Sequence, residues 1–323
     1  MDTFDNPVRD PDGPFDGPAT LDDVAERIGE HPLDGDPAEL REKYERLLRA
    51  DAAGSPAGAG EETEVGGVSG LLFRPDGGGR GGATPAGEPP RVVWLHGGGY
   101  VFGSPETHWR AGAAFAAAVG EAVFMPRYPL APEALWPAPL EQSALPVARA
   151  VLDGGRGLAV VGDSAGGHLA LTTVLALARE GRPATAAAVF SPNADRTGLS
   201  DTREANSPRD AMNNDEDDRR CASISTGPVD LPDDDPTISP LLDDLSLLPP
   251  LHVEVGGTEV LLGEGRLLEE RGRAAGAEVS LWVEPDAFHM WQLWTPWLPE
   301  ADASLARAAA FVRDHLGGAD RPA

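Results

Sequence analysis

The sequence predicts an α/β fold with a mainly parallel central sheet that is covered by helices on both faces. Three observations support this prediction. Short apolar runs with strand character recur along the chain, helical runs separate them, and one strand-like run leads into a serine flanked by glycines and then into a helix. Strands that alternate with helices form parallel sheets, so a ligand is expected at the carboxyl ends of those strands.

Two short amphipathic helices are expected near the N-terminus. Thr20 and Asp23 are typical of one helix start, and Asp36, Pro37 and Glu39 are typical of a second. Neither helix can bury its apolar face alone. Both helices should therefore pack on a larger body.

Two segments rich in glycine, alanine and proline follow. The first, "DAAGSPAGAGEE", separates the N-terminal helices from the rest, and the second, "PDGGGRGGATPAGEPP", is expected to be a hairpin loop. The regular pattern begins after this loop. Its expected strands are "RVVWL", "AVFMP", "LAVVG", "AAAVFS", "LHVEV" and "VSLWV". Helical runs separate these strands, and "GHLALTTVLALARE" is apolar on nearly every side.

The segment "LAVVGDSAGGHLAL" contains the pattern G-x-S-x-G between a strand and a helix. In this setting the chain reverses so sharply that side chains two positions before and after the serine would collide, and Gly162 and Gly166 remove that collision. The turn holds the hydroxyl of Ser164 above the sheet, at the start of a helix. Ser164 is therefore the predicted nucleophile.

A serine hydroxyl needs a base to accept its proton. The chain has seven histidines, and His289, in "VEPDAFHMW", is the one that follows the last strand in a loop. His96 also ends a strand, but it leads directly into three glycines, and its expected task is to brace that loop. His289 is therefore the predicted base.

The imidazole in turn needs an acceptor for its second nitrogen. Glu259 lies just past a strand end in "LHVEVGGTEVLLGEG", whereas Glu254 lies within the strand. Asp286 is the nearest rival, but at three residues from His289 it would have to fold back on its own loop. The chain order Ser164, Glu259, His289 is the order of the α/β-hydrolase fold.

The three glycines after His96 have a function in the same chemistry. Attack by Ser164 on a carbonyl turns its oxygen into an anion, which needs donors already in place. We expect the amide of Ala165 and amides of Gly97, Gly98 and Gly99 to form this oxyanion hole, since a backbone without Cβ can approach the oxygen closely. A phosphate-binding loop is the alternative, but no G-K-[ST] follows and the acidic charge disfavours it.

At this point the sequence resembles the hormone-sensitive-lipase-like family of α/β-hydrolase esterases. "HGGGY", "RYPLAPE", "GDSAGG", "PPLHVEVGGTEVLL" and "AFHMWQLW" match its motifs in order, over about residues 64–315. The resemblance implies hydrolysis of short-chain acyl esters without a metal or organic cofactor, and a homodimer as one form of the protein. It also implies a helical cap at residues 1–55, a catalytic domain at residues 56–319, and a second cap segment at about 195–230.

The chain departs from the family pattern in three places. Glu259 stands where many members have aspartate, Gly263 stands where a second aspartate is frequent, and "SPNAD" replaces an aromatic-bearing "SPW" pattern. The expected cap is rich in aspartate and poor in aromatic residues. These departures bear on the substrate more than on the mechanism.

Several further residues are candidates for supporting the site or lining its pocket. They are His96, Tyr100, Asp163 and Trp291, with Trp294 close by in sequence. For the aromatic members, ordinary packing is the alternative role.

Composition limits the function further. The formal net charge is −27, which disfavours nucleic acids and anionic membrane surfaces as partners and leaves a neutral small molecule. The single cysteine, Cys221, excludes an internal disulfide and a cysteine-based metal site. No apolar run reaches 18 residues and the first residues are acidic, so we expect no stable membrane anchoring and a cytoplasmic location.

The sequence thus predicts a serine carboxylesterase that acts through Ser164, His289 and Glu259. An amidase, deacetylase or acyltransferase with the same triad is an alternative. A non-catalytic receptor on the same fold is a more distant one, since fold alone does not establish activity.

Overall fold

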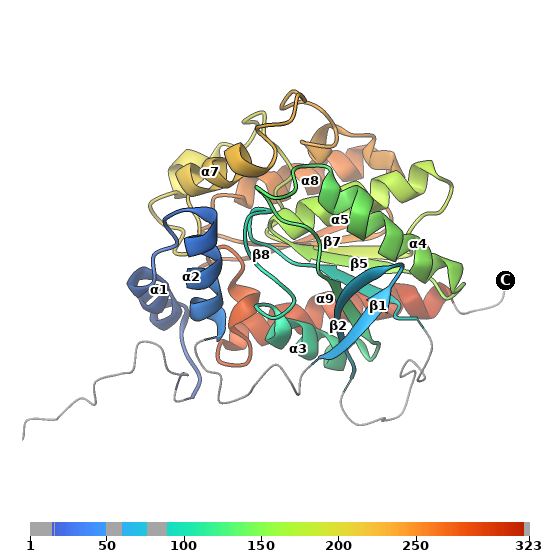
Figure 1. Cartoon of the computed structure of the whole chain (residues 1–323), viewed down its shortest axis with the longest axis horizontal. Helices are drawn as coiled ribbons and strands as arrows, with labels where there is room; N and C mark the ends of the chain where they lie inside the picture. The colour runs from blue at the N-terminus through green and yellow to red at the C-terminus, as the bar shows by residue number, and fades with distance from the viewer. Residues whose placement is uncertain (1–14, 16, 50–59, 76–88, 320–323) are drawn as a thin grey trace, which may run out of the picture.

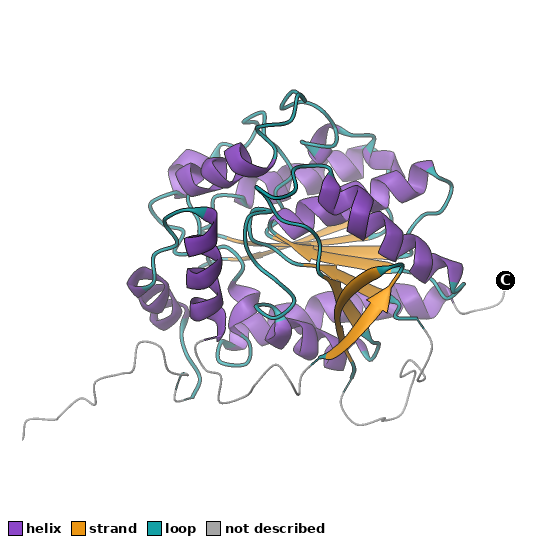
Figure 2. Ribbon diagram, in the orientation of Figure 1, coloured by secondary structure: helices purple, strands orange, loops and turns teal. Residues whose placement is uncertain are grey.

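A computed structural model describes residues 15, 17–49, 60–75 and 89–319 of the chain. Its centre is an eight-stranded sheet in the order β1-β2-β4-β3-β5-β6-β7-β8, with helices on both faces (Figure 2). The strands are β1 (Glu61–Val65), β2 (Val68–Phe73), β3 (Val92–Leu95), β4 (Val123–Pro126), β5 (Ala159–Asp163), β6 (Ala186–Phe190), β7 (Leu251–Gly256) and β8 (Val279–Glu284).

The strands from β4 to β8 across the sheet run parallel, while β1 and β2 run antiparallel at one edge. The predicted fold class and all six expected strands are confirmed. The antiparallel hairpin of β1 and β2, which turns at Gly66 and Gly67 with positive φ, is an addition.

The hairpin expected at residues 75–90 is wrong. The strands that flank this segment do not pair, because β2 bonds to β1 and β4 while β3 bonds to β4 and β5. Residues 76–88 themselves, like residues 50–59 of the earlier breaker-rich segment, lie outside the described residues.

Helices form a layer on each face of the sheet (Figure 1). Alternate residues of β5 show why: Val160 packs into one apolar cluster, and Ala159 and Val161 pack into the other. On one face lie α3 (Trp109–Val119) and α9 (Pro299–Ala319), and on the other lie α4 (Leu145–Asp153), α5 (Ala165–Arg179) and α8 (Leu262–Ala274). A π-helical turn, Leu140–Ala144, leads into α4, and short 3₁₀ turns occupy Pro240–Leu242, Leu245–Leu247 and Trp291–Trp294.

The two predicted N-terminal helices are α1 (Leu21–Glu30) and α2 (Pro37–Arg49). Thr20 Oγ1 accepts the backbone N–H of Asp23 at 3.2 Å, and the Asp23 carboxylate accepts that of Thr20 at 3.0 Å. Asp36 and Glu39 exchange the same pair of bonds at the start of α2. Both helix starts are confirmed as capping boxes.

Four helices gather at one end of the sheet, and we refer to them together as the cap: α1, α2, α6 (Thr202–Asn206) and α7 (Asp215–Ser225). Leu40 of α2 and Cys221 of α7 share a small apolar cluster with Val101 and Ala131 of the body. The N-terminal and internal parts of the cap thus meet on the loop that follows β3.

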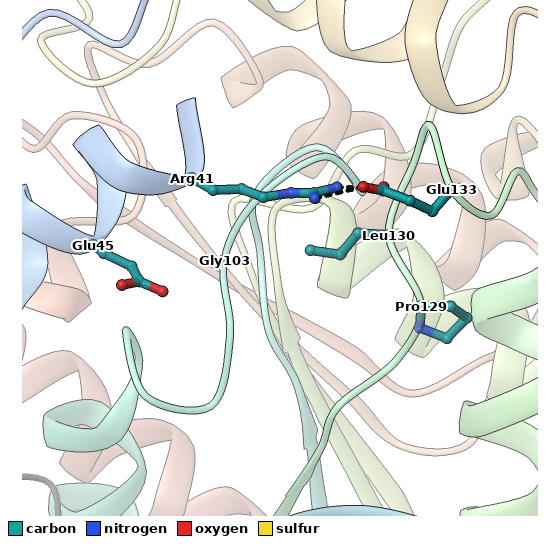
Figure 3. Close-up of a pocket in the computed structure, with 6 residues that line it drawn as sticks. All are labelled: Arg41, Glu45, Gly103, Pro129, Leu130 and Glu133. Carbon is teal, nitrogen blue, oxygen red and sulfur yellow. Dashed lines mark hydrogen bonds and ion pairs between the residues drawn. The ribbon is translucent and has the colours of Figure 1, made fainter. Parts of the chain in front are cut away.

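Arg41 fastens α2 to the body. Its guanidinium donates to the carbonyl oxygens of Val101 at 2.9 Å and Ala131 at 2.8 Å, and forms a bidentate pair with Glu133. Figure 3 shows the side chain reaching from α2 across to Glu133, above Leu130. The groove beneath it is lined by Arg41, Glu45, Gly103, Pro129, Leu130 and Glu133. Glu133 is largely exposed, so the two carbonyl bonds should contribute more than the ion pair.

Replacing Arg41 with methionine should therefore loosen α2. The Arg41→Met change keeps much of the apolar stem but leaves two carbonyls without their donor, at a cost of about 1–3 kcal/mol in unfolding free energy. Hydrogen–deuterium exchange over α2 should become faster than in wild type, while the exposed Arg46→Met control should behave as wild type. Equal exchange in the two variants would show that Arg41 does not hold the helix.

Candidate active site

Ser164 lies between β5 and α5. Its backbone has φ 54° and ψ −120°, a conformation that residues other than glycine rarely adopt. The flanking glycines permit this turn. A Cβ on Gly162 would lie 2.2 Å from the carbonyl oxygen of Gly166, and one on Gly166 would lie 2.0 Å from that of Leu95. The collision expected from the sequence is thus present, and the strain is localised where the hydroxyl is presented.

His289 lies in the loop after β8 and meets the serine across the end of the sheet. Its Nε2 is 3.0 Å from Ser164 Oγ, and both side chains are buried. Burial lowers the pKa of the His289 imidazole to about 4, which keeps the ring neutral at pH 7. A neutral imidazole nitrogen at this distance can accept the hydroxyl proton.

Glu259 is the carboxylate nearest the far side of the imidazole, with 4.0 Å between Glu259 Oε2 and His289 Nδ1. Oε2 accepts hydrogen bonds from Ser191 Oγ at 2.6 Å and from the Gly256 amide at 3.0 Å. Among the described residues, neither His289 Nδ1 nor Glu259 Oε1 has a hydrogen-bond partner. Burial, followed by the nearby Asp210 carboxylate, raises the pKa of Glu259. Asp286, the rival acid, is exposed.

Ser191 is a functional residue that the sequence analysis missed. It directly follows β6 and has φ 46°, and its hydroxyl both donates to Glu259 and accepts the amide of Met290 at 3.3 Å. The hydroxyl thus joins the loop of the acid to the loop of the base. A serine that follows a strand and precedes proline was the only available signal.

In the loop after β3, glycine residues, which have no side chain, lie close to Ser164. Gly98 and Gly99 both have positive φ, and a Cβ on Gly99 would lie 2.6 Å from Cys221 Cβ of the cap. Gly98 and Gly99 line the pocket at Ser164, and Ala165 begins α5 directly after the serine. The amides of these three residues are therefore the candidates for binding a developing oxyanion.

Gly97 requires a correction. Its amide donates to Asp163 Oδ2 at 2.9 Å and approaches His108 Nε2 at 3.3 Å, so it is committed to the protein. Glycine is still needed there, since a Cβ would lie 2.4 Å from Asp163 Oδ2. The residue allows close packing of two loops and supplies no donor to the oxyanion hole in this conformation.

Asp163 anchors the loop of glycines to β5. Its Oδ1 accepts Trp94 Nε1 at 2.7 Å, and its Oδ2 accepts the Gly97 amide and contacts His108 Nε2 at 3.0 Å. Burial opposes the charge, but His108 and the other donors outweigh it and lower the pKa of Asp163. His108, which directly precedes α3, was not singled out from the sequence.

His96 braces the same loop from the other side. Its ring stacks on Tyr128 at 4.1 Å between centroids, and its Nδ1 bonds to the Gly97 carbonyl oxygen at 2.8 Å. Tyr128 also donates its hydroxyl proton to the carbonyl of His96 at 2.6 Å. The arrangement matches the bracing role expected for His96.

A small pocket opens at Ser164, His289, Gly98 and Gly99. The cap supplies much of its wall through Leu33, Tyr44, Met212, Asn213, Asp218 and Cys221. No cluster of side chains able to hold a metal ion occurs in the described ranges. Within the same ranges, no helix is long and apolar enough to cross a membrane.

Comparison with known proteins agrees with this geometry. A family model described as an alpha/beta hydrolase fold matches residues 92–293. The crystal structure of an esterase from the bacterial hormone-sensitive lipase family superposes with a TM-score of 0.81 and 33% identity, over 92% of this chain and 98% of that chain. The chain belongs to the hormone-sensitive-lipase-like family of α/β-hydrolases.

Two curated relatives and a further structure illustrate this family. An acetyl-hydrolase of Streptomyces hygroscopicus is 36% identical over 70% of this chain and 76% of its own length, and an esterase of Acinetobacter venetianus is 30% identical over 68% and 74%. A structure of EstE5 soaked with p-nitrophenyl butyrate is 27% identical, with a TM-score of 0.78 over 92% of this chain and 98% of that one. The chain is accordingly an enzyme of an ester-hydrolysing family.

Two of the three departures from the family pattern can be described in the structure. A Cβ on Gly263 would lie 2.3 Å from Ser200 Oγ, so a larger side chain there would require Ser200 to move. Asn193 of "SPNAD" donates to Asp218 Oδ1 at 2.9 Å and accepts from Arg203 at 3.1 Å. Asn193 is therefore part of a buried polar network.

That network joins the cap to α8. Arg203 of α6 pairs with Asp218 at 2.6 Å and with Glu264 of α8 at 2.5 Å, and Arg196 also pairs with Asp218. Glu264 accepts the backbone amides of Ala194 and Asp195 as well. Buried charges paired in this way favour one seating of the cap, because any other would leave a charge unpaired.

The aromatic candidates for the pocket are core residues instead. The Tyr100 hydroxyl bonds to His168 Nδ1 at 2.6 Å, and its ring packs among Tyr128 and Trp136. Trp291 and Trp294 are buried in the apolar cluster beneath α3 and α9. None of the three lines the pocket at Ser164. The two tryptophans belong to the short buried turn after His289, and Tyr100 is held in the core by its contact with His168.

Asp163 provides a test of the loop geometry. In Asp163→Asn an amide N–H₂ group would face at least one of the donors, so we expect unfolding free energy to fall by about 2–4 kcal/mol and kcat/KM to fall at least about tenfold. Urea unfolding and ester hydrolysis measure the two effects. Asp153→Asn is the control, because the Asp153 carboxylate is exposed and pairs with a partly exposed Arg182. If both variants behaved alike, Asp163 would not be the anchor of the loop.

Proposed function

We propose that the protein is a serine carboxylesterase that hydrolyses short-chain acyl esters through a covalent acyl-enzyme. The observation that carries this proposal is the 3.0 Å contact between Ser164 Oγ and His289 Nε2, in a turn that holds the serine at the mouth of the pocket. The names of the relatives support the reaction class, and the p-nitrophenyl butyrate with which EstE5 was soaked supports a short acyl chain.

In the first half of the reaction, His289 accepts the proton of Ser164 as its oxygen attacks the ester carbonyl. The amides of Gly98, Gly99 and Ala165 stabilise the oxyanion that forms. His289 then gives the proton to the leaving alcohol. In the second half, His289 accepts a proton from water as the water oxygen attacks the acyl-enzyme, and the same amides stabilise the second oxyanion. His289 then returns the proton to Ser164 Oγ as the bond to the acyl group breaks, and the carboxylic acid is released.

Glu259 is proposed to orient the imidazole and to stabilise its cationic form. Burial makes a negative charge on Glu259 unfavourable in the resting site, but a positive charge that develops on His289 at about 4 Å favours that negative charge. The proposed contact is between His289 Nδ1 and the Glu259 carboxylate, since Nδ1 and Glu259 Oε1 both have no hydrogen-bond partner among the described residues.

The small pocket supports a short acyl chain. Phe102 and Met290 of the body and Leu33 and Met212 of the cap close around the serine, leaving little space for a long chain. The cap assigned to residues 1–55 and about 195–230 is proposed to be the part that sets substrate choice. A cytoplasmic location and a homodimer stay predictions.

The nucleophile is tested by Ser164→Ala. This variant should lose at least about a thousandfold in kcat for p-nitrophenyl acetate and butyrate while unfolding as wild type does. A fluorophosphonate should label wild type and not the variant, and p-nitrophenyl palmitate should be a poor substrate for wild type. Substantial turnover or labelling of Ser164→Ala would rule out this serine. Failure of wild type to label would favour the receptor alternative.

The acid is tested by comparing Glu259→Gln with Asp286→Asn. A glutamine at 259 cannot stabilise the imidazolium, so kcat should fall by roughly 10²–10⁴. Asp286 is exposed, and its asparagine variant should stay within about twofold of wild type. The opposite order would transfer the role of the acid to Asp286.

A further inference from the structure

One carboxylate outside the proposed triad, that of Asp210, accepts hydrogen bonds from the backbone beside Glu259 and from the backbone of His289. Asp210 follows α6 in the cap, and its Oδ1 accepts the backbone N–H of His289 at 3.1 Å. Its Oδ2 accepts the backbone N–H of Val260, the residue after Glu259, at 3.0 Å. The catalytic steps proposed above do not use Asp210.

The peptide group between Glu259 and Val260 makes a second hydrogen bond to the cap, through its carbonyl oxygen. Asn206 Nδ2 donates to the carbonyl oxygen of Glu259 at 2.8 Å, while Asp210 accepts the N–H of Val260. Both polar atoms of the Glu259–Val260 peptide are therefore bonded to the cap. Thr202 Oγ1 adds a bond to the Val260 carbonyl at 2.9 Å. The orientation of this peptide determines where the Glu259 side chain begins.

The base loop is held on both sides in a similar way. Asp210 holds the amide of His289, and Ser191 holds the amide of Met290. A catalytic imidazole must stay within a few tenths of an ångström of its working position, and a loop without such bonds has greater freedom. Asp210 is the residue that connects the cap to both loops.

Retaining an acid at this position costs stability. Burial raises the pKa of Asp210 to about 6 even though four backbone N–H donors act to lower it. The remaining two donors are the amides of Met212 and Asn213, which belong to the cap. An ionised carboxylate offers enough lone pairs for all four donors, whereas an asparagine offers one oxygen and would direct an N–H₂ group at another donor.

Resting on the function proposed above, we propose that Asp210 is a positioning residue, which holds the His289 loop and the Glu259–Val260 peptide in one fixed relation. The catalytic steps then depend on a cap that is packed on the body. The bonds of Asp210 to the two loops form when the cap packs there, and all of them are lost when the cap moves away. The cap therefore contributes to the rate of the chemical step and not only to the choice of substrate.

Asp210→Asn is the decisive variant. Its oxygen can keep the Oδ1 bonds to the amides of Met212, Asn213 and His289, and since Met212 and Asn213 line the pocket, KM for p-nitrophenyl butyrate should stay within about twofold. The bond to Val260 is lost and an N–H₂ group faces that amide instead, so kcat and the rate of fluorophosphonate labelling should both fall by about 10- to 100-fold. Exchange of the backbone amide of Val260 with deuterium should become faster.

Asp195→Asn is the matched control. Asp195 is a buried carboxylate that accepts the amides of Thr197 and Leu199, both in its own loop and away from the triad. This variant should lose stability but keep kcat within about twofold. A folded Asp210→Asn protein with wild-type kcat, or one in which only KM rises, would overturn the proposal.

Asn206→Ala covers the case in which Asp210→Asn does not fold. It removes the bond to the Glu259 carbonyl and should lower kcat by roughly 3- to 10-fold with KM unchanged. An unchanged kcat there would also overturn the proposal. Wild type and Ser164→Ala show separately whether the proposed function fails. If neither protein hydrolyses esters or reacts with the fluorophosphonate, the proposed function is wrong. The amide exchange of Asp210→Asn still tests whether Asp210 holds the Glu259–Val260 peptide.

Discussion

The backbone strain at Ser164 is the constraint on which the rest of the site depends. The residue can adopt positive φ only because Gly162 and Gly166 let two backbone segments approach closely, with the carbonyl oxygen of Leu95 pressed against Gly166. That contact also fixes where β3 ends relative to the serine. The loop of glycines that follows β3 is therefore placed beside the nucleophile by the packing of the turn itself.

Buried polar groups then hold each loop in place. Asp163 fastens the glycine loop to β5 through Trp94 and Gly97, and Ser191 links the loops of Glu259 and His289. Asp163 and Ser191 each accept a donor from a different segment of the chain, so moving one loop would leave a polar group unpaired in a region of low dielectric. This accounts for a precise site built almost wholly on loops.

The cap has a similar dependence on paired groups. Its N-terminal part is fastened by Arg41, and its internal part is fastened by the network of Arg203, Asp218 and Glu264. The pocket at Ser164 lies where these two parts meet over the glycine loop. Cap residues therefore form part of the pocket wall, while two others, Asn206 and Asp210, bond to the loops of Glu259 and His289.

The sequence by itself determined the fold class, the strand order along the chain, both helix starts and the candidates Ser164, His289 and Glu259. These features depend on local pattern: apolar periodicity, capping residues and glycines spaced around a turn. The tertiary structure alone decided that Gly97 donates to Asp163, that Tyr100 and Trp291 are core residues, and that Ser191 and Asp210 touch the triad loops. Contacts between segments distant in sequence depend on packing across the sheet, and a single chain of letters carries no periodic signal for them.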